Sequence, residues 1–533
     1  MATAKNGSIL VGMQPPYSRT LFELLDEQAS RRPDAIAVID DAGTLRWRDL
    51  AERARKAAGV LRACGIGRGD RIGLLINNRC EWLEVAFGAW LLGAVVVPFS
   101  TWSTRRELAF LLGDSEISAL VSLAGFGRED YAAMLRDLAP ERAVAVLLID
   151  GDAGFPEYAA VRDAAPPLPT PAPGEGASAC DDAIVLYSSG STSTPKAIAL
   201  AHYLVVENGF NIGERQGLGP DDKVLLAPPL FWAYGGVNAL PAAFGHGATL
   251  VLQGRFDAGE ALDLIERHGC TAIYTLPGMT DALIRHPAFR RERTRSLRTG
   301  LTIGAPQDVI RAAETLGATE ICNIYGASEV GGNCCVTQHD WALERRATCQ
   351  GFPLPGVQLR IVEEGTGAVL GAGQPGHIEV RGPYVMRGYA GSSATHNATA
   401  FTADGWFRTG DIGQLSAAGE MVFLGRSTEM IKRAGINVSP AEVEDVLMQH
   451  PAVAQAAVVG APGEGGESIV AFVVPRGDVR PGPAELAAHC RALASGYKVP
   501  DRFEILDALP TTVTGKLMRR DLKDAAARLS RGG

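Results

Sequence analysis

The sequence lacks the usual marks of secreted, zinc-binding and membrane-spanning proteins. Its nine cysteines are scattered and no two form a C-x-x-C pair, so a zinc site is not expected. We interpret the neighbours Cys334 and Cys335 as small core residues rather than as a redox pair. The first fifteen residues have no apolar stretch of the kind found in signal peptides. These absences favour a soluble protein of a reducing compartment, and we expect it in the cytoplasm.

Long hydrophobic runs and an excess of positive charge are also missing. The longest apolar run, from Val85 to Val97, has 13 residues and is interrupted by Gly88 and Gly93. A bilayer span needs about 20 residues, so we expect here a buried helix followed by a strand. The net charge of −9 argues against a nucleic acid as the main partner, because such partners select surfaces rich in Lys and Arg.

The patterns that are present indicate an α/β protein of more than one domain. Its 533 residues exceed the size of a single domain. Amphipathic helical spacing at residues 20–31 and 50–61 alternates with apolar runs such as 71–76, as in sheets covered by helices. Residues 164–178 are rich in Pro, Ala and Gly and are predicted to be a linker. From residue 351 the pattern changes to strands and turns.

The end of the chain has the pattern of a small α+β lobe. After residue 425 we expect three helices and two strands, enough for a separate domain. The expected helices lie at 440–448, near 484–494 and at 520–528, and the expected strands at 454–459 and 468–474.

The most unusual segment is SSGSTSTPK, residues 188–196, which directly follows the apolar run 183–187. An isolated cluster of this kind is typical of a surface turn. Here it leaves the carboxyl end of a predicted parallel strand, where open α/β sheets bind ligands. Hydroxyls, backbone N–H groups and a lysine suit triphosphate oxygens. The segment is not a Walker A loop, because Pro195 precedes Lys196 and no Ser or Thr follows.

Five segments in order resemble the motifs of the adenylate-forming (ANL) superfamily, which includes acyl- and aryl-CoA ligases, peptide-synthetase adenylation domains and luciferases. They are YSSGSTSTPKAIALAH (187–202), IYGASE (324–329), DGWFRTGDIG (404–413), GRSTEMIKRAGINVSPAEVE (425–444) and LPTTVTGKLMRRDL (509–522). The resemblance implies that a carboxylate and ATP give acyl-AMP and pyrophosphate, and that a thiol then attacks the acyl carbon. ATP, Mg²⁺ and CoA are the implied cosubstrates and cofactor.

The resemblance also implies the domain organisation. Residues 1–425 would form the N-terminal adenylation domain, built of covered sheets and a distorted β-barrel subdomain. Residues 426–533 would form a small mobile α+β domain that swivels about a hinge at Thr428 after adenylation.

By the same resemblance, several residues surround the nucleotide. Glu329 would bind Mg²⁺ and Ser328 would reach the α-phosphate. Asp411 and Arg426 would bind the ribose, for which a carboxylate has two acceptor oxygens. The β- and γ-phosphates would be held by Ser189, Gly190, Ser191, Thr192 and Lys196, and the adenine by Gly304, Ala305, Pro306, Tyr325 and Gly326.

Different residues of the last domain would act in the two half-reactions. Lys516 would stabilise the transition state of adenylation as a point charge near the α-phosphate and the carboxylate. In the thiol step, the segment from Lys432 to Gly435 would face the pantetheine of CoA, and its basic pair would suit the CoA phosphates. The sequence departs from the family pattern at Ser193, Ala197 and Thr428. The first two stiffen the hydroxyl-rich loop, which puts ATP affinity or closure of that loop in question, and the third removes the usual charge of the hinge.

The segment PPLFWAYGGVNAL, residues 228–240, aligns with the border of the acyl pocket. The expected pocket residues are Phe231, Trp232, Ala233, Tyr234 and Gly235. There is no Asp to pair with an ammonium group, so an α-amino acid is disfavoured. FWAYG is similar to benzoate-type ligases, and we predict an aromatic, alicyclic or medium-chain acid.

Three other readings remain open. A carrier protein or an amine could replace CoA as the acceptor, the chain could be a non-catalytic nucleotide-binding regulator, or it could be a luciferase-like oxygenase. Glu329 and Lys516 argue against the regulator, because binding alone requires neither. Whether the chain forms a homodimer is left open by the sequence.

Overall fold

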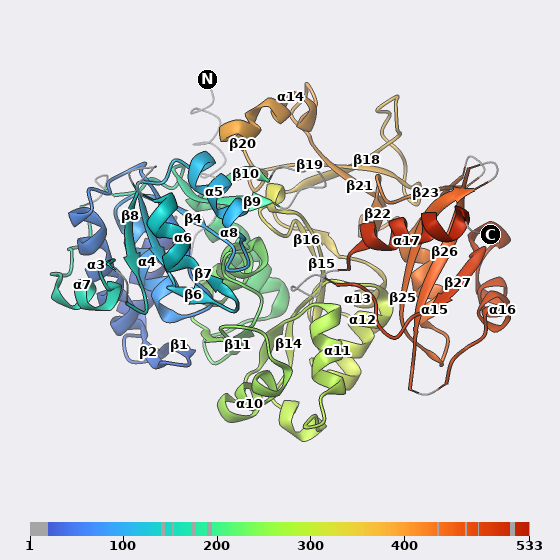
Figure 1. Ribbon diagram of the computed structural model, residues 1–533, viewed down its shortest axis with the longest axis horizontal. Helices are drawn as coiled ribbons and strands as arrows, with labels where there is room; N and C mark the ends of the chain where they lie inside the picture. The colour runs from blue at the N-terminus through green and yellow to red at the C-terminus, as the bar shows by residue number, and fades with distance from the viewer. Residues whose placement is uncertain are drawn as a thin grey trace.

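A computed structural model describes residues 20–139, 144–151, 154–172, 176–188, 195–433, 436–463, 466–477, 479–511 and 517–531. Two large sheets covered by helices form most of the molecule, and a smaller sheet joins them to a lobe at the end of the chain (Figure 1). None of the described helices has the length and apolar character needed to cross a membrane. The predicted α/β class is confirmed.

The seven-stranded sheet carries the hydroxyl-rich segment. Five of its strands are parallel, whereas β10 is antiparallel to both β9 and β20. Residues 189–195 therefore join two antiparallel neighbours, and Lys196 is the first residue of β10 rather than part of the loop. In spatial order the strands are β20 (Tyr389–Ala390), β10 (Lys196–Ala201), β9 (Asp182–Ser188), β4 (Val95–Pro98), β3 (Arg71–Leu75), β5 (Ala119–Ser122) and β8 (Ala145–Leu148).

The nine-stranded sheet places the IYGASE motif at the carboxyl end of a buried parallel strand. That strand is β15, and its four residues are all buried. The spatial order is β17 (Phe352–Pro353), β16 (Cys335–Val336), β15 (Cys322–Tyr325), β14 (Thr299–Thr302), β13 (Ala272–Tyr274), β11 (Lys223–Leu226), β12 (Thr249–Leu252), β1 (Ile36–Asp40) and β2 (Gly43–Arg46).

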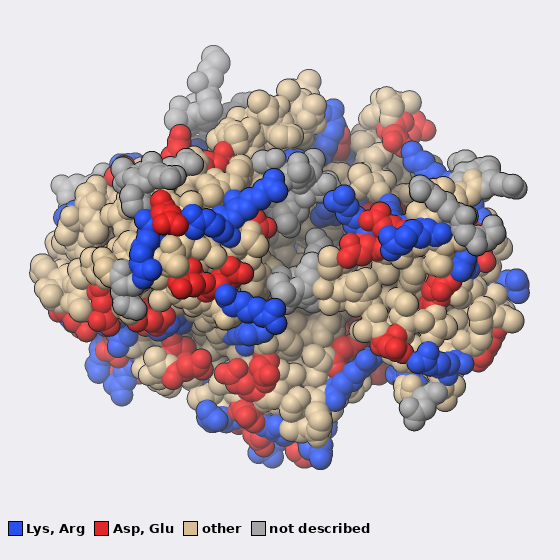
Figure 2. Space-filling model, in the orientation of Figure 1, with Lys and Arg blue, Asp and Glu red and all other residues tan. Residues whose placement is uncertain are grey.

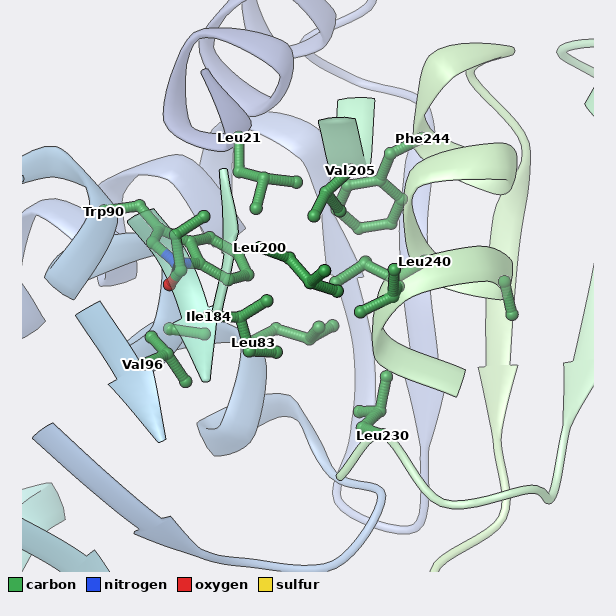
Figure 3. Packing of buried hydrophobic residues seen from close by; sticks show 14 of the residues in the cluster. Leu21, Leu83, Trp90, Val96, Ile184, Leu200, Val205, Leu230, Leu240 and Phe244 are labelled. Atoms are coloured by element: carbon green, nitrogen blue, oxygen red, sulfur yellow. Dashed lines mark hydrogen bonds between the residues drawn. The ribbon is translucent and has the colours of Figure 1, made fainter. Parts of the chain in front are cut away.

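The helices between these sheets share one hydrophobic core. Figure 3 shows Ile184 and Leu200 from the seven-stranded sheet packed toward Leu240 of helix α9 (Leu240–Gly245). The predicted helix and strand between Val85 and Val97 are confirmed as α4 (Cys80–Leu91) and β4. The helix expected at 20–31 is α2 (Leu21–Arg31), and the Thr20 side chain caps it. The other helices of this core are α3 (Trp47–Ala63) and α8 (His202–Gln216).

Most of the remaining helices in the large part of the chain cover the two large sheets and pack with them in further hydrophobic clusters, and the other elements form short turns. The helices are α5 (Arg105–Asp114), α6 (Tyr131–Leu138), α7 (Tyr158–Ala164), α10 (Ala258–His268), α11 (Pro277–Arg285), α12 (Pro306–Arg311), α13 (Leu343–Thr348) and α14 (Asn397–Ala400). A two-stranded ribbon is formed by β6 (Gly125–Phe126) and β7 (Glu129–Asp130). Short helical turns span Ala233–Ala239, Arg291–Thr294, Ala312–Leu316, Ser328–Val330 and Gly391–His396, and a further one, Gly496–Lys498, belongs to the last lobe.

A four-stranded antiparallel sheet lies between the large sheets and the last lobe. It confirms the change of pattern after residue 351. Its order is β18 (Gln358–Val362), β19 (Gly376–Arg381), β21 (Phe407–Leu415) and β22 (Met421–Arg426). In the register of β21 and β22, Asp411 is paired with Arg426.

The end of the chain folds as the expected separate α+β lobe. The helix predicted at 440–448 is α15 (Pro440–Met448), with Ser439 as its N-cap. Two hydrophobic clusters fill the lobe, and their buried members all come from residue 431 onward. The other elements are β23 (Ile431–Arg433), β24 (Ile436–Val438), β25 (Val453–Gly463), β26 (Gly466–Pro475), β27 (Arg502–Ile505), α16 (Pro483–Leu493) and α17 (Arg519–Arg531).

Candidate active site

The structure brings together Tyr325, Asp411 and Arg426, which come from three different strands. The Tyr325 hydroxyl donates a 2.9 Å hydrogen bond to Oδ2 of Asp411. Nε of Arg426 lies 3.6 Å from Oδ1 of the same carboxylate. Asp411 is 5% exposed, and this burial raises its pKa to about 6, although Arg426 and the Tyr325 hydrogen bond act to lower the pKa. The Asp411 carboxylate is therefore buried and held in one orientation, with Oδ2 bound to Tyr325 and Oδ1 beside Arg426.

Tyr325 already has one stacking partner. Its ring packs against Phe423 of β22, with centroids 5.6 Å apart and planes inclined by 27°. Directly after it, Gly326 is closely packed, because a Cβ there would lie 2.0 Å from the carbonyl oxygen of Gly332. Tyr325 is thus a buried core residue, and its ring forms a flat surface at the end of β15.

Glu329 and Ser328 lie in the short helical turn that follows β15. Oε1 of Glu329 accepts a 3.0 Å hydrogen bond from the Tyr389 hydroxyl, and the backbone carbonyl of Glu329 accepts one of 2.7 Å from the N–H of Met386. The carboxylate is half-buried. A single fixed carboxylate beside the predicted phosphate site would fit Mg²⁺, which proteins usually hold by one or two carboxylates and the oxygens of the bound phosphates.

Lys196 points toward the same place from β10. Its Nζ lies 5.0 Å from the ring centroid of Tyr389, over the face of the ring. The predicted phosphate contacts Ser189, Gly190, Ser191 and Thr192 lie outside the described residues, as do Gly435 and Lys516.

The predicted adenine loop, Gly304 to Pro306, leads into helix α12. The N–H of Ala305 donates a 3.0 Å hydrogen bond to Oδ2 of Asp308. A Cβ at Gly304 would lie 2.6 Å from that oxygen and 2.7 Å from the Asp308 Cβ, so a larger residue there would displace the Asp308 side chain. Burial raises the pKa of Asp308 to about 6.

Two of the expected acyl-pocket residues form an aromatic cluster with Trp102, which lies outside the sequence motifs. The Trp102 ring lies 5.1 Å from that of Phe231 and 5.3 Å from that of Trp232, both edge-on. Trp102 and Trp232 are half-buried and Phe231 is buried. Trp102 follows β4, which runs parallel to β9, so the cluster lies near the end of the strand that leads into the hydroxyl-rich segment.

Ala233, Tyr234 and Gly235 begin a buried π-helical turn. The Tyr234 hydroxyl donates to the carbonyl oxygens of Thr275 and Leu301, at 3.2 and 2.8 Å. A Cβ at Gly235 would lie 2.2 Å from the carbonyl oxygen of Pro229. The Tyr234 side chain therefore holds this turn in place. The position that a Cβ would occupy at Gly235 is next to the backbone of Pro229.

The predicted hinge and thiol-side residues lie just beyond β22. The N–H and hydroxyl of Ser427 both donate to the carbonyl oxygen of Gly410, at 3.0 and 2.8 Å, next to Asp411. Lys523 donates to the Thr428 carbonyl oxygen at 3.3 Å. Lys432 is exposed.

Arg433 has a structural role in the last lobe. It donates to the carbonyl oxygens of Tyr497 and Val499 and pairs with Asp501 at 2.6 Å. This differs from the expectation of a basic pair turned toward CoA phosphates, because the guanidinium is already held by its own lobe.

Three residues of the site had no clear signal in the sequence. Trp102 follows an apolar strand, Phe423 is one of several aromatic residues in a strand, and Tyr389 follows the turn residue Gly388. Their importance depends on contacts across the fold, which spacing along the chain does not reveal. On the face shown in Figure 2, Lys and Arg are interspersed with Asp and Glu around a hollow in the middle of the molecule.

Both parts of the chain match families of known proteins. Residues 25–390 match the AMP-binding enzyme family and residues 442–516 match the AMP-binding enzyme C-terminal domain. The chain is 30% identical over 532 residues to a putative acyl-CoA synthetase, YngI, of Bacillus subtilis, covering 95% of this chain and 96% of that protein. It is 33% identical over 501 residues to a feruloyl-CoA synthase of an Amycolatopsis species, with 93% and 97% covered.

A solved structure shares the whole architecture. A benzoate CoA ligase from Burkholderia xenovorans superposes with a TM-score of 0.83 at 26% identity, covering 95% of this chain and 99% of that one. Family matches over both parts of the chain, relatives of nearly equal length and a shared fold lead to one conclusion. The chain belongs to the family of AMP-binding, adenylate-forming enzymes that includes acyl-CoA ligases.

Proposed function

We propose that this protein converts an apolar carboxylic acid to its acyl-AMP at the expense of ATP and then transfers the acyl group to CoA. The observation that carries the proposal is the arrangement at the end of β15. On one side, Tyr325 is hydrogen-bonded to Asp411, which forms an ion pair with Arg426. On the other side, Glu329 is hydrogen-bonded to Tyr389, whose ring contacts the ammonium group of Lys196.

The first half-reaction joins an anionic carboxylate to the anionic α-phosphate. Its main physical obstacle is charge repulsion, so fixed cations and hydrogen-bond donors are the groups that lower the barrier. Lys196, Ser189, Gly190, Ser191 and Thr192 would hold the departing phosphates, and Ser328 and Lys516 the α-phosphate. Mg²⁺ held by Glu329 would neutralise charge on the phosphate oxygens. Asp411 and Arg426 would fix the ribose, and Tyr325, Gly326 and the loop Gly304, Ala305 and Pro306 would enclose the adenine.

The acid is proposed to be aromatic, alicyclic or medium-chain. Support comes from the half-buried Trp102 and Trp232 packed with Phe231, and from the absence of Asp or Glu in residues 228–240. An unpaired ammonium group would be very costly to bury beside these rings. Feruloyl-CoA synthase and benzoate CoA ligase, the relatives named above, carry aromatic acids in their names.

Two lobes and a hinge are part of this proposal. Residues 1–425 would hold ATP and the acid, and residues 426–533 would turn about Thr428 between the two half-reactions. The separate hydrophobic clusters of the last lobe support this boundary. After the turn, Lys432 and Gly435 would lie along the pantetheine. All nine cysteines are free thiols, which fits the cytoplasmic location that we propose.

The test is ATP–pyrophosphate exchange with a panel of benzoic, cinnamic, cycloalkane and C6–C10 acids, followed by addition of free CoA to the best substrate. Formation of the acyl-CoA without a second protein supports the proposal. A preference for amino acids would contradict the acid class. Exchange without thioester would favour the alternative, an adenylating enzyme that passes the acyl group to a carrier protein or an amine. Sedimentation of the same sample would show whether the chain is a homodimer.

A further inference from the structure

Tyr389 contacts two groups to which the proposed function gives roles in binding ATP and Mg²⁺, Lys196 and Glu329. It belongs to the short edge strand β20, where it is paired with Ile198 of β10, two residues after Lys196. The neighbouring pair in the register is Ala390 and Ala197. Although it lies at a sheet edge, Tyr389 is only 8% exposed.

The hydroxyl and the ring of Tyr389 have different partners. Its hydroxyl donates to Oε1 of Glu329 at 3.0 Å, and its ring lies under the Lys196 ammonium at 5.0 Å. Within the described part of the chain, neither Lys196 nor Glu329 forms an ion pair. The Tyr389 side chain therefore contacts a cation with its ring and an anion with its hydroxyl, so each charged group has a neutral partner.

Tyr389 is itself held in place at its backbone. Its N–H donates to Oδ1 of Asn397 at 2.7 Å, and Nδ2 of Asn397 donates to its carbonyl oxygen at 3.0 Å. The preceding Gly388 has φ of 150°, and a Cβ there would lie 3.1 Å from the Asn397 amide. Three residues earlier, the N–H of Met386 holds the backbone of Glu329. One segment thus fixes both ends of Glu329.

We propose that Tyr389 is a positioning residue that holds Glu329 toward the metal ion and Lys196 toward the phosphates of ATP, at a fixed separation. This inference rests on the proposed function, because it assumes that Glu329 binds Mg²⁺ and that Lys196 binds phosphate. Tyr389 itself would not touch the reacting atoms.

The physical reason is that the hydroxyl and the ring of Tyr389 act on different groups. The hydroxyl occupies Oε1 of Glu329, which would leave Oε2 to bind a metal ion. The ring attracts the ammonium without cancelling its charge, since a cation over an aromatic face retains its outward field. A direct Lys–Glu pair at this place would weaken both groups as ligands for ATP·Mg²⁺.

The test measures ATP binding by calorimetry, without any acid, in EDTA and in saturating Mg²⁺. In Tyr389→Phe the ring remains and the hydroxyl is lost. We expect the gain in ATP affinity produced by Mg²⁺ to shrink about tenfold, the usual effect of losing a hydrogen bond to a charged group, with affinity in EDTA unchanged. Tyr389→Leu should in addition weaken ATP binding in EDTA about threefold, because the Lys196 ammonium loses its ring.

The matched control is Tyr158→Phe, which removes another buried tyrosine hydroxyl that donates to a carboxylate, Oε2 of Glu84 at 3.3 Å, far from the site. It should leave the effect of Mg²⁺ unchanged. If Tyr389→Phe does not fold, Asn397→Ala provides the test, since it releases the Tyr389 backbone and should reduce the Mg²⁺ effect by a smaller factor.

A folded Tyr389→Phe with the wild-type response to Mg²⁺ would overturn the inference, as would an unchanged response in Asn397→Ala. Failure of the proposed function has a different signature. In that case the wild-type protein would bind ATP without any help from Mg²⁺, or would not bind ATP at all.

Discussion

The Tyr325 hydroxyl donates a 2.9 Å hydrogen bond to Asp411, although 86 residues separate the two in the chain. The bond joins the end of a strand in the nine-stranded sheet to β21 of the four-stranded sheet. With Arg426 on the other oxygen, it fixes the direction of the carboxylate. A neutral amide in this place would keep the shape but lose one acceptor and the ion pair.

We therefore expect Asp411→Asn to raise the KM for ATP about tenfold or more, since hydrogen bonds to charged groups are the stronger class. The KM for the acid should change little. Pyrophosphate exchange at varied ATP measures both. Asp404→Asn is the control, because Asp404 also pairs with an arginine, Arg360, but is exposed; an equal effect of the two substitutions would contradict the assignment of Asp411 to the ribose.

The raised pKa of Asp411 predicts a pH dependence. Burial moves this pKa up to about 6, so the carboxylate gains a proton as the pH falls through 6, well above the range of an ordinary aspartate. The ionised form is the one that accepts two hydroxyl groups. The kcat/KM for ATP should therefore fall below pH 6, and bound ATP should shift the corresponding limb of kcat to lower pH.

This acid limb should be missing from the profile of Asp411→Asn, whose residual activity should be flat in that range. A limb that persists in the variant would assign the titration to another group.

The Lys516→Ala substitution separates the two half-reactions. The lysine is expected to act only when the carboxylate attacks the α-phosphate, so adenylation should slow at least 100-fold, the usual scale for removing a preorganised charge stabiliser. Thioester formation from synthetic acyl-AMP and CoA should be nearly normal. Lys498→Ala, which removes a lysine of the same lobe paired with Glu442, is the control. Undiminished adenylation in Lys516→Ala would contradict the role proposed for this lysine in the first half-reaction.

The sequence predicted the fold class and most elements because their signals are local. The helix at 440–448 has a serine N-cap followed by proline and glutamate, and its bounds are as expected. The strands at 454–459 and 468–474 were predicted too short, since β25 and β26 extend as a long antiparallel pair whose length depends on mutual hydrogen bonding. The antiparallel placement of β10 was not predicted, because strand direction is set by tertiary packing.

The candidate site was predicted only where the residues lie in motifs. Tyr325, Glu329, Asp411 and Arg426 were found this way, and the structure brings them together. Trp102 and Tyr389 were not, because each acts through residues more than 50 positions away. Arg433 was given a ligand role from its charge alone, and the carbonyl oxygens that hold it could not be predicted from the motif.

Trp102 is predicted to set the preference among acids. Removing the ring in Trp102→Ala should lower kcat/KM for benzoic or cinnamic acids about tenfold, because an aromatic pair contributes about 0.5–1.5 kcal/mol beyond its buried area and Trp102 contacts two rings. Activity with C8–C10 acids should fall less, since the space left by the indole admits a chain. Trp341→Ala, at an aromatic contact with Phe352, serves as the control. A uniform loss over all acids would indicate a packing role instead.

Gly235 is predicted to affect stability more than specificity. In Gly235→Ala the new Cβ would meet the carbonyl oxygen of Pro229 at 2.2 Å, and because that atom is backbone, the π-helical turn has to shift. Overpacking of this kind costs about 1–3 kcal/mol, so the melting temperature should drop by several degrees. Gly496→Ala, where a Cβ meets no atom within 4 Å, should leave it unchanged. If Gly235→Ala instead melts normally and changes the order of preferred acids, Gly235 lines the acyl pocket directly.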